Sequence, residues 1–236
     1  FNALRSDLGN STVANRPTLN MGANGLTFGA NWDMYNMSVT GTSANMIQAG
    51  ASTKLVNVKG VNTSTTAGRS AVLVSARTFI HGCEFVSYRG VGVTVGANHA
   101  VISASYIHDS DKGVSSATSS SVLVIRNSII ADNVTAAIAT AATASTLVVI
   151  DNTTLYGAEN KRGIGVDLIT GVTNFRITNS IIAGFVTGIT HADVQNVGFD
   201  DYNAYYNNTT DVTNWVKGPH DSVLNPTFTS IAQLTG

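Results

Sequence analysis

The sequence is poor in charged residues, prolines and cysteines, and these shortages exclude several classes of protein. Charged residues make up 11% of the 236 positions, against about a quarter in typical soluble domains. A net charge of -1, without any Lys/Arg cluster, argues against nucleic acid as a partner because nothing would neutralise its phosphates. The single cysteine, Cys83, excludes an internal disulfide framework and a CxxC site. We expect it to be a buried, inert thiol in a strand.

Long apolar segments and helical patterns are missing as well. The uncharged stretch at residues 134–150 has 17 positions and includes several threonines, whereas a membrane-spanning helix needs about 20 mainly apolar residues. No apolar stripe with a period of 3.6 residues persists along the chain. We therefore expect neither a membrane span nor a helical fold. Thr, Ser, Asn, Ala and Gly are abundant instead, and they suit tight turns and thin stacked strands.

A short apolar repeat runs through most of the chain at intervals of 22 to 27 residues. Its clearest copies are residues 123–130, 148–155 and 175–182. We align all copies on one anchor position, which falls at Asn36, Val58, Gly82, Ala104, Asn127, Asn152, Asn179 and Asn203.

Each copy of the repeat has the same apolar pattern around its anchor. Two positions before the anchor stands an apolar residue in every copy except the last, which has Asp201 there. Another apolar residue stands three positions after the anchor, and a second apolar run follows about ten positions after the anchor. Alternation with a period of two indicates short strands with one buried face. One coil cannot bury a core alone, but coils stacked about 4.8 Å apart can bury one another. A β-sandwich is the main alternative, although it does not predict one column shared by eight copies.

The repeat therefore predicts an all-β chain folded as a single-stranded right-handed parallel β-helix, a solenoid of about eight coils. We predict an N-terminal capping or covering segment at residues 1–31, the β-helix at residues 32–206, and a C-terminal cap or tail at residues 207–236.

The last four anchors are all asparagines. Asparagine tolerates the left-handed turn conformation, and its amide can bond the same side chain one coil above and below. We predict an internal structural stack, without a chemical role, of Asn127, Asn152, Asn179 and Asn203.

The coil pattern, as in residues 123–133, resembles the right-handed parallel β-helix proteins of the pectate-lyase-like superfamily over about residues 32–206. Residues 201–208, followed by residues 218–221 and 225–228, resemble a terminal segment of β-helix proteins from bacteria and their phages. This resemblance implies a closing coil and cap, and a protein of the bacterial or phage surface or tailspike type. These motifs are specific for the fold and only weakly specific for function.

The same resemblance does not bring a catalytic set with it. Pectate lyases of this fold have a calcium-binding Asp cluster with catalytic Arg or Lys on one face, and this chain has no matching basic set. Polygalacturonase-like relatives have several short motifs, of which only Asp200-Asp201 and His81-Gly82 are echoed here. These two lie in coils far apart and in the wrong order.

Two aspartates share an offset in neighbouring coils. Asp109 and Asp132 both stand five residues after an anchor, so we expect them about one strand spacing apart. Carboxylates that close raise the pKa of one of them, or bind a cation. With His108 and Asp111 nearby, they are candidates for a catalytic acid/base pair or a Ca²⁺ site at a turn edge. The ordinary interpretation is a set of solvated turn aspartates, with Arg89 and Asp111 as a surface ion pair.

A further set of apolar residues falls at offsets that alternation places on the outside. It consists of Phe79, Val101, Val124 and Val149 before the anchors, and of Tyr106, Ile129 and Ile181 after them. An outward apolar stripe across several coils seldom faces water in a monomer. Either the N-terminal segment or a loop covers it, or it packs against other copies, as in trimeric phage spikes and fibres.

Two functions of different classes follow from these patterns. The first is a non-catalytic extracellular or phage virion rod for assembly, with surface-glycan attachment as an added role and no cofactor. Its partners would be other copies in a homo-oligomer such as a homotrimer, a fibre or virion, and a polysaccharide. The alternative is a polysaccharide lyase or glycoside hydrolase at the edge formed by Asp109 and Asp132, where Ca²⁺ would bind.

Overall fold

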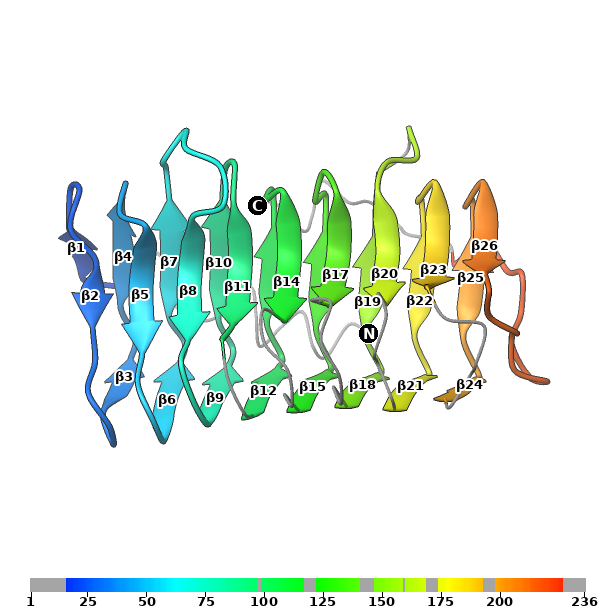
Figure 1. Cartoon of the computed structure of the whole chain (residues 1–236), viewed down its shortest axis with the longest axis horizontal. Helices are drawn as coiled ribbons and strands as arrows, with labels where there is room; N and C mark the ends of the chain where they lie inside the picture. The colour runs from blue at the N-terminus through cyan, green and yellow to red at the C-terminus, as the bar shows by residue number, and fades with distance from the viewer. Residues whose placement is uncertain are drawn as a thin grey trace.

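The computed structural model describes residues 16–96, 99–116, 122–140, 147–158, 160–168, 174–192 and 198–226. Within these ranges the chain forms three parallel sheets, which wind into a right-handed β-solenoid of about seven turns (Figure 1). No helix occurs in the described residues. The predicted all-β parallel β-helix is therefore confirmed, with a coil count close to the predicted eight.

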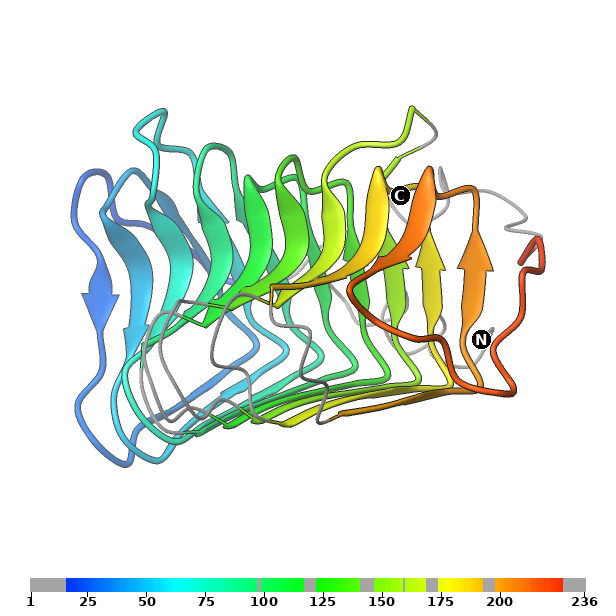
Figure 2. The same ribbon diagram turned by 45° about the vertical axis from the view of Figure 1, so that its right-hand side comes forward.

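The three sheets form the three faces of the rod, and each complete coil contributes one strand to each sheet (Figure 2). Sheet A contains β1 (Thr18–Asn20), β4 (Ser38–Gly41), β7 (Lys59–Asn62), β10 (Glu84–Ser87), β13 (Tyr106–His108), β16 (Ile129–Ala131), β19 (Thr154–Tyr156), β22 (Ile181–Ala183) and β25 (Ala204–Tyr206). Sheet B contains β2 (Leu26–Thr27), β5 (Asn45–Ala49), β8 (Ser70–Val74), β11 (Val91–Val95), β14 (Lys112–Ser116), β17 (Ala136–Thr140), β20 (Ile164–Leu168), β23 (Thr187–His191) and β26 (Thr210–Thr213). Sheet C contains β3 (Asp33–Tyr35), β6 (Thr53–Val56), β9 (Thr78–His81), β12 (His99–Ser103), β15 (Val122–Arg126), β18 (Leu147–Asp151), β21 (Asn174–Thr178) and β24 (Gly198–Asp201).

The parallel ladders extend beyond the predicted limits of the solenoid at both ends. Strands β1 and β2, which lie inside the predicted N-terminal segment 1–31, already pair with β4 and β5. Strand β26 follows the predicted limit at residue 206 and pairs with β23. The remaining parts of the predicted terminal segments, residues 1–15 and 227–236, lie outside the described residues.

Six of the eight predicted anchors share one column, and two are wrong by one residue. Met34 pairs with Leu55, so Asn57 rather than Val58 stands opposite Asn36. At the other end Thr178 pairs with Asp201, which places Tyr202 rather than Asn203 opposite Asn179. The first error arose because Leu55 and Val56 are both apolar, and alternation alone does not tell which one points inward. Leu55 is fully buried and Val56 is only partly buried.

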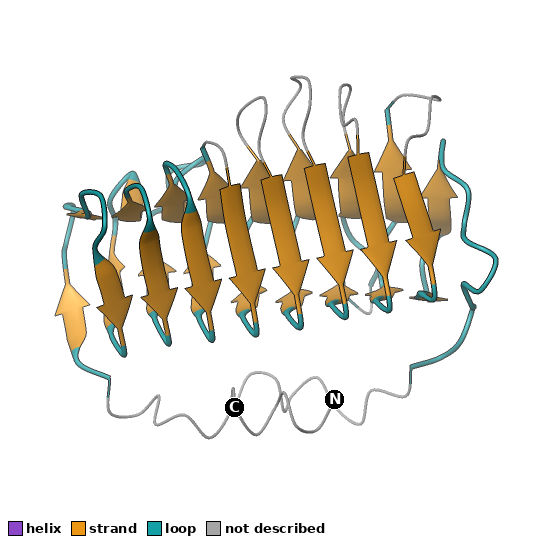
Figure 3. Ribbon diagram, turned by 90° about the horizontal axis from the view of Figure 1, so that it is seen from below, coloured by secondary structure: helices purple, strands orange, loops and turns teal. Residues whose placement is uncertain are grey.

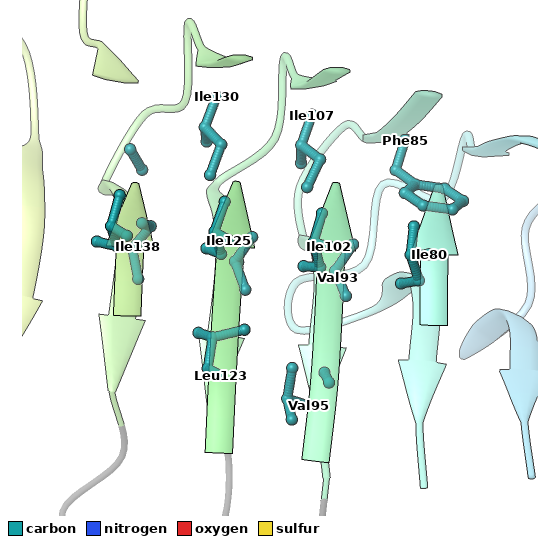
Figure 4. Packing of buried hydrophobic residues seen from close by; sticks show 14 of the residues in the cluster. Ile80, Phe85, Val93, Val95, Ile102, Ile107, Leu123, Ile125, Ile130 and Ile138 are labelled. Carbon is teal, nitrogen blue, oxygen red and sulfur yellow. The ribbon is translucent and has the colours of Figure 1, made fainter. Parts of the chain in front are cut away.

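The core is a set of columns of aliphatic side chains that point inward from all three sheets. Figure 4 shows Ile80, Ile102 and Ile125 in one such column, beside Ile107 and Ile130 in another. Beside the large inward side chain of Phe85, the neighbouring coil has a small residue. At Gly60 an added Cβ would lie 2.9 Å from Cδ1 of Phe85, because the Phe85 ring occupies the space that a side chain at residue 60 would need.

A corner of two residues joins sheet C to sheet A in every coil. The first residue has a positive φ at all eight corners, at Asn36, Asn57, Gly82, Ala104, Asn127, Asn152, Asn179 and Tyr202. This left-handed conformation explains the preference for Asn and Gly at the position. The corner is the sharp bend that the anchor column predicted.

The asparagines of this column do not form the internal stack that we predicted. Asn152 donates a hydrogen bond to Asn127 Oδ1 over 2.8 Å, but at a partly exposed surface. Asn179 donates to Asp151 Oδ1 over 3.0 Å instead of to Asn152. Asn203 is buried, but it occupies the next position of its corner. The prediction was wrong because the left-handed residue directs its side chain outward and the residue after it points inward.

The second corner residue builds the internal ladder. Side chains at this position are buried, at Val58, Cys83, Ser105, Ser128, Thr153, Ser180 and Asn203. Each polar member can accept a hydrogen bond from the backbone N–H of the coil before it. Ser105 Oγ accepts from Cys83 N at 3.2 Å, and Ser180 Oγ accepts from Thr153 N at 3.2 Å. Because a buried N–H without a partner is costly, this hydroxyl ladder stabilises the corner.

Candidate functional site

The predicted carboxylate edge is present at the end of sheet A. Strands β13 and β16 pair in register, so Asp109 and Asp132 follow them at equivalent positions. Both residues have the left-handed backbone conformation, with φ of 49° and 54°. Burial raises the pKa of Asp132, and the charge of Asp109 raises it further, while Arg162 and His108 oppose the shift.

His108 lies between two carboxylates. Its Nδ1 is 2.8 Å from Asp109 Oδ2, and its Nε2 is 3.4 Å from Glu84 Oε1. Lys59 Nζ reaches the same Glu84 oxygen at 2.7 Å from the neighbouring strand β7. Burial alone would raise the pKa of Glu84, but the hydrogen bonds from His108 and Lys59 outweigh it and lower the pKa to about 2.

Tyr106 completes the group. Its ring stacks on His108 with 3.9 Å between the ring centroids. Burial raises the pKa of Tyr106, and the charges of Asp132, Asp109 and Glu84 raise it further, so the hydroxyl keeps its proton. Within the described part of the chain, this buried hydroxyl has no hydrogen-bond partner.

The geometry favours an ion network across coils over a catalytic pair. Both ring nitrogens of His108 already face carboxylates, Nδ1 that of Asp109 and Nε2 that of Glu84, so neither nitrogen is directed toward a substrate. Asp111, the fourth predicted member, accepts a hydrogen bond from Thr135 Oγ1 of the next coil instead. Across the residues that the structure describes, no group of three or more His, Cys, Asp or Glu side chains is placed to hold a metal ion.

Sequence reasoning missed Lys59, Glu84 and Tyr106 as members of this network. All three share one outward column of sheet A, since Lys59 pairs with Glu84 and Glu84 with Tyr106. They stand two residues after the corner positions Asn57, Gly82 and Ala104. The anchor at Val58 was wrong by one residue, and this moved Lys59 out of the column and hid the alignment.

The predicted apolar stripe is divided between two faces. Phe79, Val101, Val124 and Val149 pair in register on sheet C and point outward, with Phe79 40% exposed and the valines partly exposed. Tyr106, Ile129 and Ile181 lie around the corner on sheet A, where they pack against a small buried cluster of Ala131, Tyr156 and Ala183. The two groups therefore do not form one continuous stripe.

We call the outward group on sheet C the sheet C patch: Phe79, Val101, Val124 and Val149, with Val122 and Leu147 beside them on β15 and β18. Figure 3, which views the rod from below, shows the evenly spaced strands of this sheet. Polar groups bound the patch at both ends. Lys54 lies 3.8 Å from Asp33 on one side, and Arg176 lies over the ring of Phe199 at 5.5 Å on the other.

Comparison with known proteins identified no relative of this chain. No protein-family model, curated protein or solved structure matches it. In the part of the chain that the structure describes, no helix is long and apolar enough to cross a membrane.

Proposed function

We propose that this chain is a non-catalytic structural rod that assembles laterally with other copies of itself through the sheet C patch. The observation that supports this most directly is the in-register outward column of Phe79, Val101, Val124 and Val149. Apolar side chains in a continuous patch of this kind typically mark an interaction surface. Their burial in an interface would contribute on the order of 25 cal/mol per Å² of apolar area.

Another copy of the chain fits this patch better than an irregular partner. The patch repeats at the strand spacing of about 4.8 Å, and only a surface with the same pitch can interleave with it coil after coil. A second copy has the same pitch because it has the same strands. The net charge of -1 also leaves little electrostatic repulsion between copies.

We further propose an extracellular or virion location and a kinship with the pectate-lyase-like β-helix proteins of the phage tailspike type. The parallel solenoid and the turns rich in Thr, Ser and Asn support this proposal. A homotrimer, a fibre or virion as the larger assembly, and attachment to a surface glycan belong to the same proposal and rest on the resemblance.

The test compares the oligomeric state of the chain with that of two matched variants by light scattering on a sizing column. Val124→Lys places a charge in the centre of the sheet C patch, and Ser115→Lys places the same charge on the outward face of sheet B. We expect the original chain and Ser115→Lys to self-associate and Val124→Lys to be monomeric. A monomeric original chain, or association that survives Val124→Lys, would contradict the proposal.

A polysaccharide lyase or glycoside hydrolase is the second candidate, favoured by one specific observation. Asp132 is a half-buried carboxyl beside the exposed carboxyl of Asp109, and its pKa is raised by burial and by that neighbour. A carboxyl that holds its proton is what a general acid requires. Ca²⁺ at Asp109 and Asp132 would serve a lyase instead, but the ion needs about six to eight oxygen ligands.

Incubation with acidic and neutral polysaccharides, with and without Ca²⁺, tests this candidate. New reducing ends would report hydrolysis, and unsaturated products would report a lyase. Turnover that is abolished in both Asp109→Asn and Asp132→Asn would favour the enzyme over the rod, and no turnover on any substrate leaves the rod as the better proposal.

A further inference from the structure

The C-terminal end of the solenoid is closed by residues 214–222, which we call the C-terminal closure. Trp215 is 8% exposed and packs over the last coil. Its ring meets Phe175 edge-on at 5.3 Å and stacks on His191 at 5.7 Å, measured between ring centroids. The indole therefore covers apolar side chains that a following coil would otherwise cover.

The rest of the closure imitates the corner of a ninth coil. His220 stacks on Tyr202, the corner residue of the last coil, with ring centroids 4.6 Å apart. Asp221 Oδ1 accepts a hydrogen bond from Asn203 N at 2.7 Å, as the serines of the hydroxyl ladder do for the coils before them. Ser222 then pairs with Ala204 as the first residue of a further parallel strand would.

Inside this corner two carboxyl groups meet. Asp200 Oδ2 accepts hydrogen bonds from Tyr205 Oη at 2.8 Å and from Trp215 Nε1 at 3.0 Å. Asn203 Nδ2 faces three acceptors, namely Asp200 Oδ1, Asp221 Oδ1 at 3.2 Å and Ile177 O at 3.2 Å. Two amide hydrogens cannot serve three acceptors separately, so one further proton between the carboxyls would satisfy the site.

Charge favours placing that proton on Asp200. Asp221 is already stabilised as an anion by the backbone N–H groups of Asn203 and Gly218, the latter at 2.8 Å. Burial raises the pKa of Asp200, the hydrogen bond from Tyr205 lowers it, and the charge of Asp221 raises it again, to about 7.

We propose that the C-terminal closure is a proton-dependent lock, held in place when Asp200 and Asp221 share one proton and loosened when both are ionised. Opening exposes Asp200 to water, where a carboxyl has its ordinary pKa of about 4. The closed state therefore holds a proton that the open state lacks between about pH 4 and the pKa of the closed state. Opening becomes easier as the pH rises through that window and changes no further above it.

Other ionisable groups face the closure and must be separated from this pair. His220 Nδ1 lies 2.9 Å from Asp201 Oδ2, which makes this pair a second ionisable contact between the closure and the last coil. Lys217 lies 3.0 Å from Asp211 and 5.3 Å from the ring centroid of Tyr205. His191 stacks on Trp215, and Tyr202 stacks on His220, so both also face the closure.

Hydrogen exchange of the full chain, read on the peptide that contains residues 214–222 and corrected for intrinsic rates, tests the lock. Because opening releases one proton, protection is expected to fall about tenfold per pH unit from about pH 4 to 7 and then to level off. In a Trp32→Phe background Trp215 is the single tryptophan, since the chain has two. Its quenching by acrylamide reports the same opening independently.

Asp200→Asn is the decisive variant, since its amide can donate to Asp221 and still accept from Tyr205 and Trp215. We expect protection in this variant to be high and independent of pH, and the control His220→Gln to keep the pH dependence of the original chain. Asp221→Asn removes the second charge, so the pH above which protection stops falling should be lower in this variant. It also tests the proposal if Asp200→Asn does not fold. The proposal would be overturned if protection of residues 214–222 in the original chain did not depend on pH. It would also be overturned if His220→Gln removed the pH dependence and the carboxyl variants did not change it.

Discussion

Single residues in the hydroxyl ladder are interchangeable when they keep an inward acceptor. Cys83 shares its column with Ser105, Ser128 and Ser180, and its Sγ accepts from Val58 N at 3.4 Å. Burial raises the pKa of the Cys83 thiol to about 12, against small opposing effects of backbone hydrogen bonds and Arg16. The thiol is thus a ladder member without nucleophilic character, as the sequence led us to expect.

Two substitutions of Cys83 test the contribution of the hydroxyl ladder to stability. Cys83→Ser should change the free energy of unfolding by less than about 1 kcal/mol, because serine supplies the same acceptor. Cys83→Val should cost about 1–3 kcal/mol, since it leaves the buried N–H of Val58 without a partner. Urea denaturation of both variants measures the difference, and equal stabilities would show that the ladder contributes nothing at this coil.

The ion network supplies a second prediction at the same scale. Glu84 has a folded-state pKa of about 2, below its ordinary value, so its stabilising effect is present above about pH 4 and lost as the pH falls through 2. Glu84→Gln should remove on the order of 2 kcal/mol at neutral pH, after allowance for solvent screening, and flatten stability between about pH 5 and 2. Denaturation curves collected across this range, with Glu84→Gln beside the original chain, check both effects. An unchanged acid limb in the variant would rule out Glu84 as its source.

At the scale of strands and corners, the period of the repeat was enough to predict the architecture but not every register. The sequence predicted parallel strands, inward columns and a sharp bend, because alternation and coil spacing are local properties of the chain. It missed the register at Val58 because two adjacent apolar residues, Leu55 and Val56, satisfy the pattern equally well. Only pairing between strands, as in Met34 with Leu55, decides between them.

The candidate sites, like the fold, could be predicted from the sequence only in part. The alignment of Asp109 with Asp132, and of Phe79 with Val149 through two valines, follows from coil spacing alone. The position of His108 between Asp109 and Glu84 depends on side-chain directions that spacing does not contain. The carboxyl pair of the C-terminal closure was hidden for another reason, because residues 214–222 leave the repeat and no periodic signal covers them.

Size complementarity between neighbouring strands gives a prediction for Gly60. Gly60→Ala should destabilise the fold by about 1–3 kcal/mol, because its Cβ would press on the ring of Phe85. Gly29→Ala is the matched control, since the nearest atom to its Cβ is at 3.8 Å. Thermal unfolding of both variants, and of Gly60→Ala combined with Phe85→Leu, should show that the smaller residue at 85 restores part of the loss.

At the scale of the whole molecule, the side of the rod and its C-terminal end have different proposed roles. The sheet C patch is bounded by polar groups and lies along the rod, so assembly through it would be lateral. The C-terminal closure pairs with β25 at Ala204 and binds the corner before it at Asn203, so it covers an edge that would otherwise be open to pairing with other strands. Light scattering on the Val124→Lys variant and hydrogen exchange on the Asp200→Asn variant address these two roles separately.

The constant two-residue corner also limits how such a chain can change in length. Every coil passes from sheet C to sheet A through two residues, although successive corners are separated by anything from 21 to 27 positions. One residue inserted at a corner would reverse inside and outside for the strand that follows. We therefore expect the other two bends of a coil to accept added residues. A foreign peptide inserted in such a bend would lie at a distance along the rod that is a whole multiple of the strand spacing. Duplication of a complete coil would lengthen the rod and keep the inward and outward directions of every strand that follows.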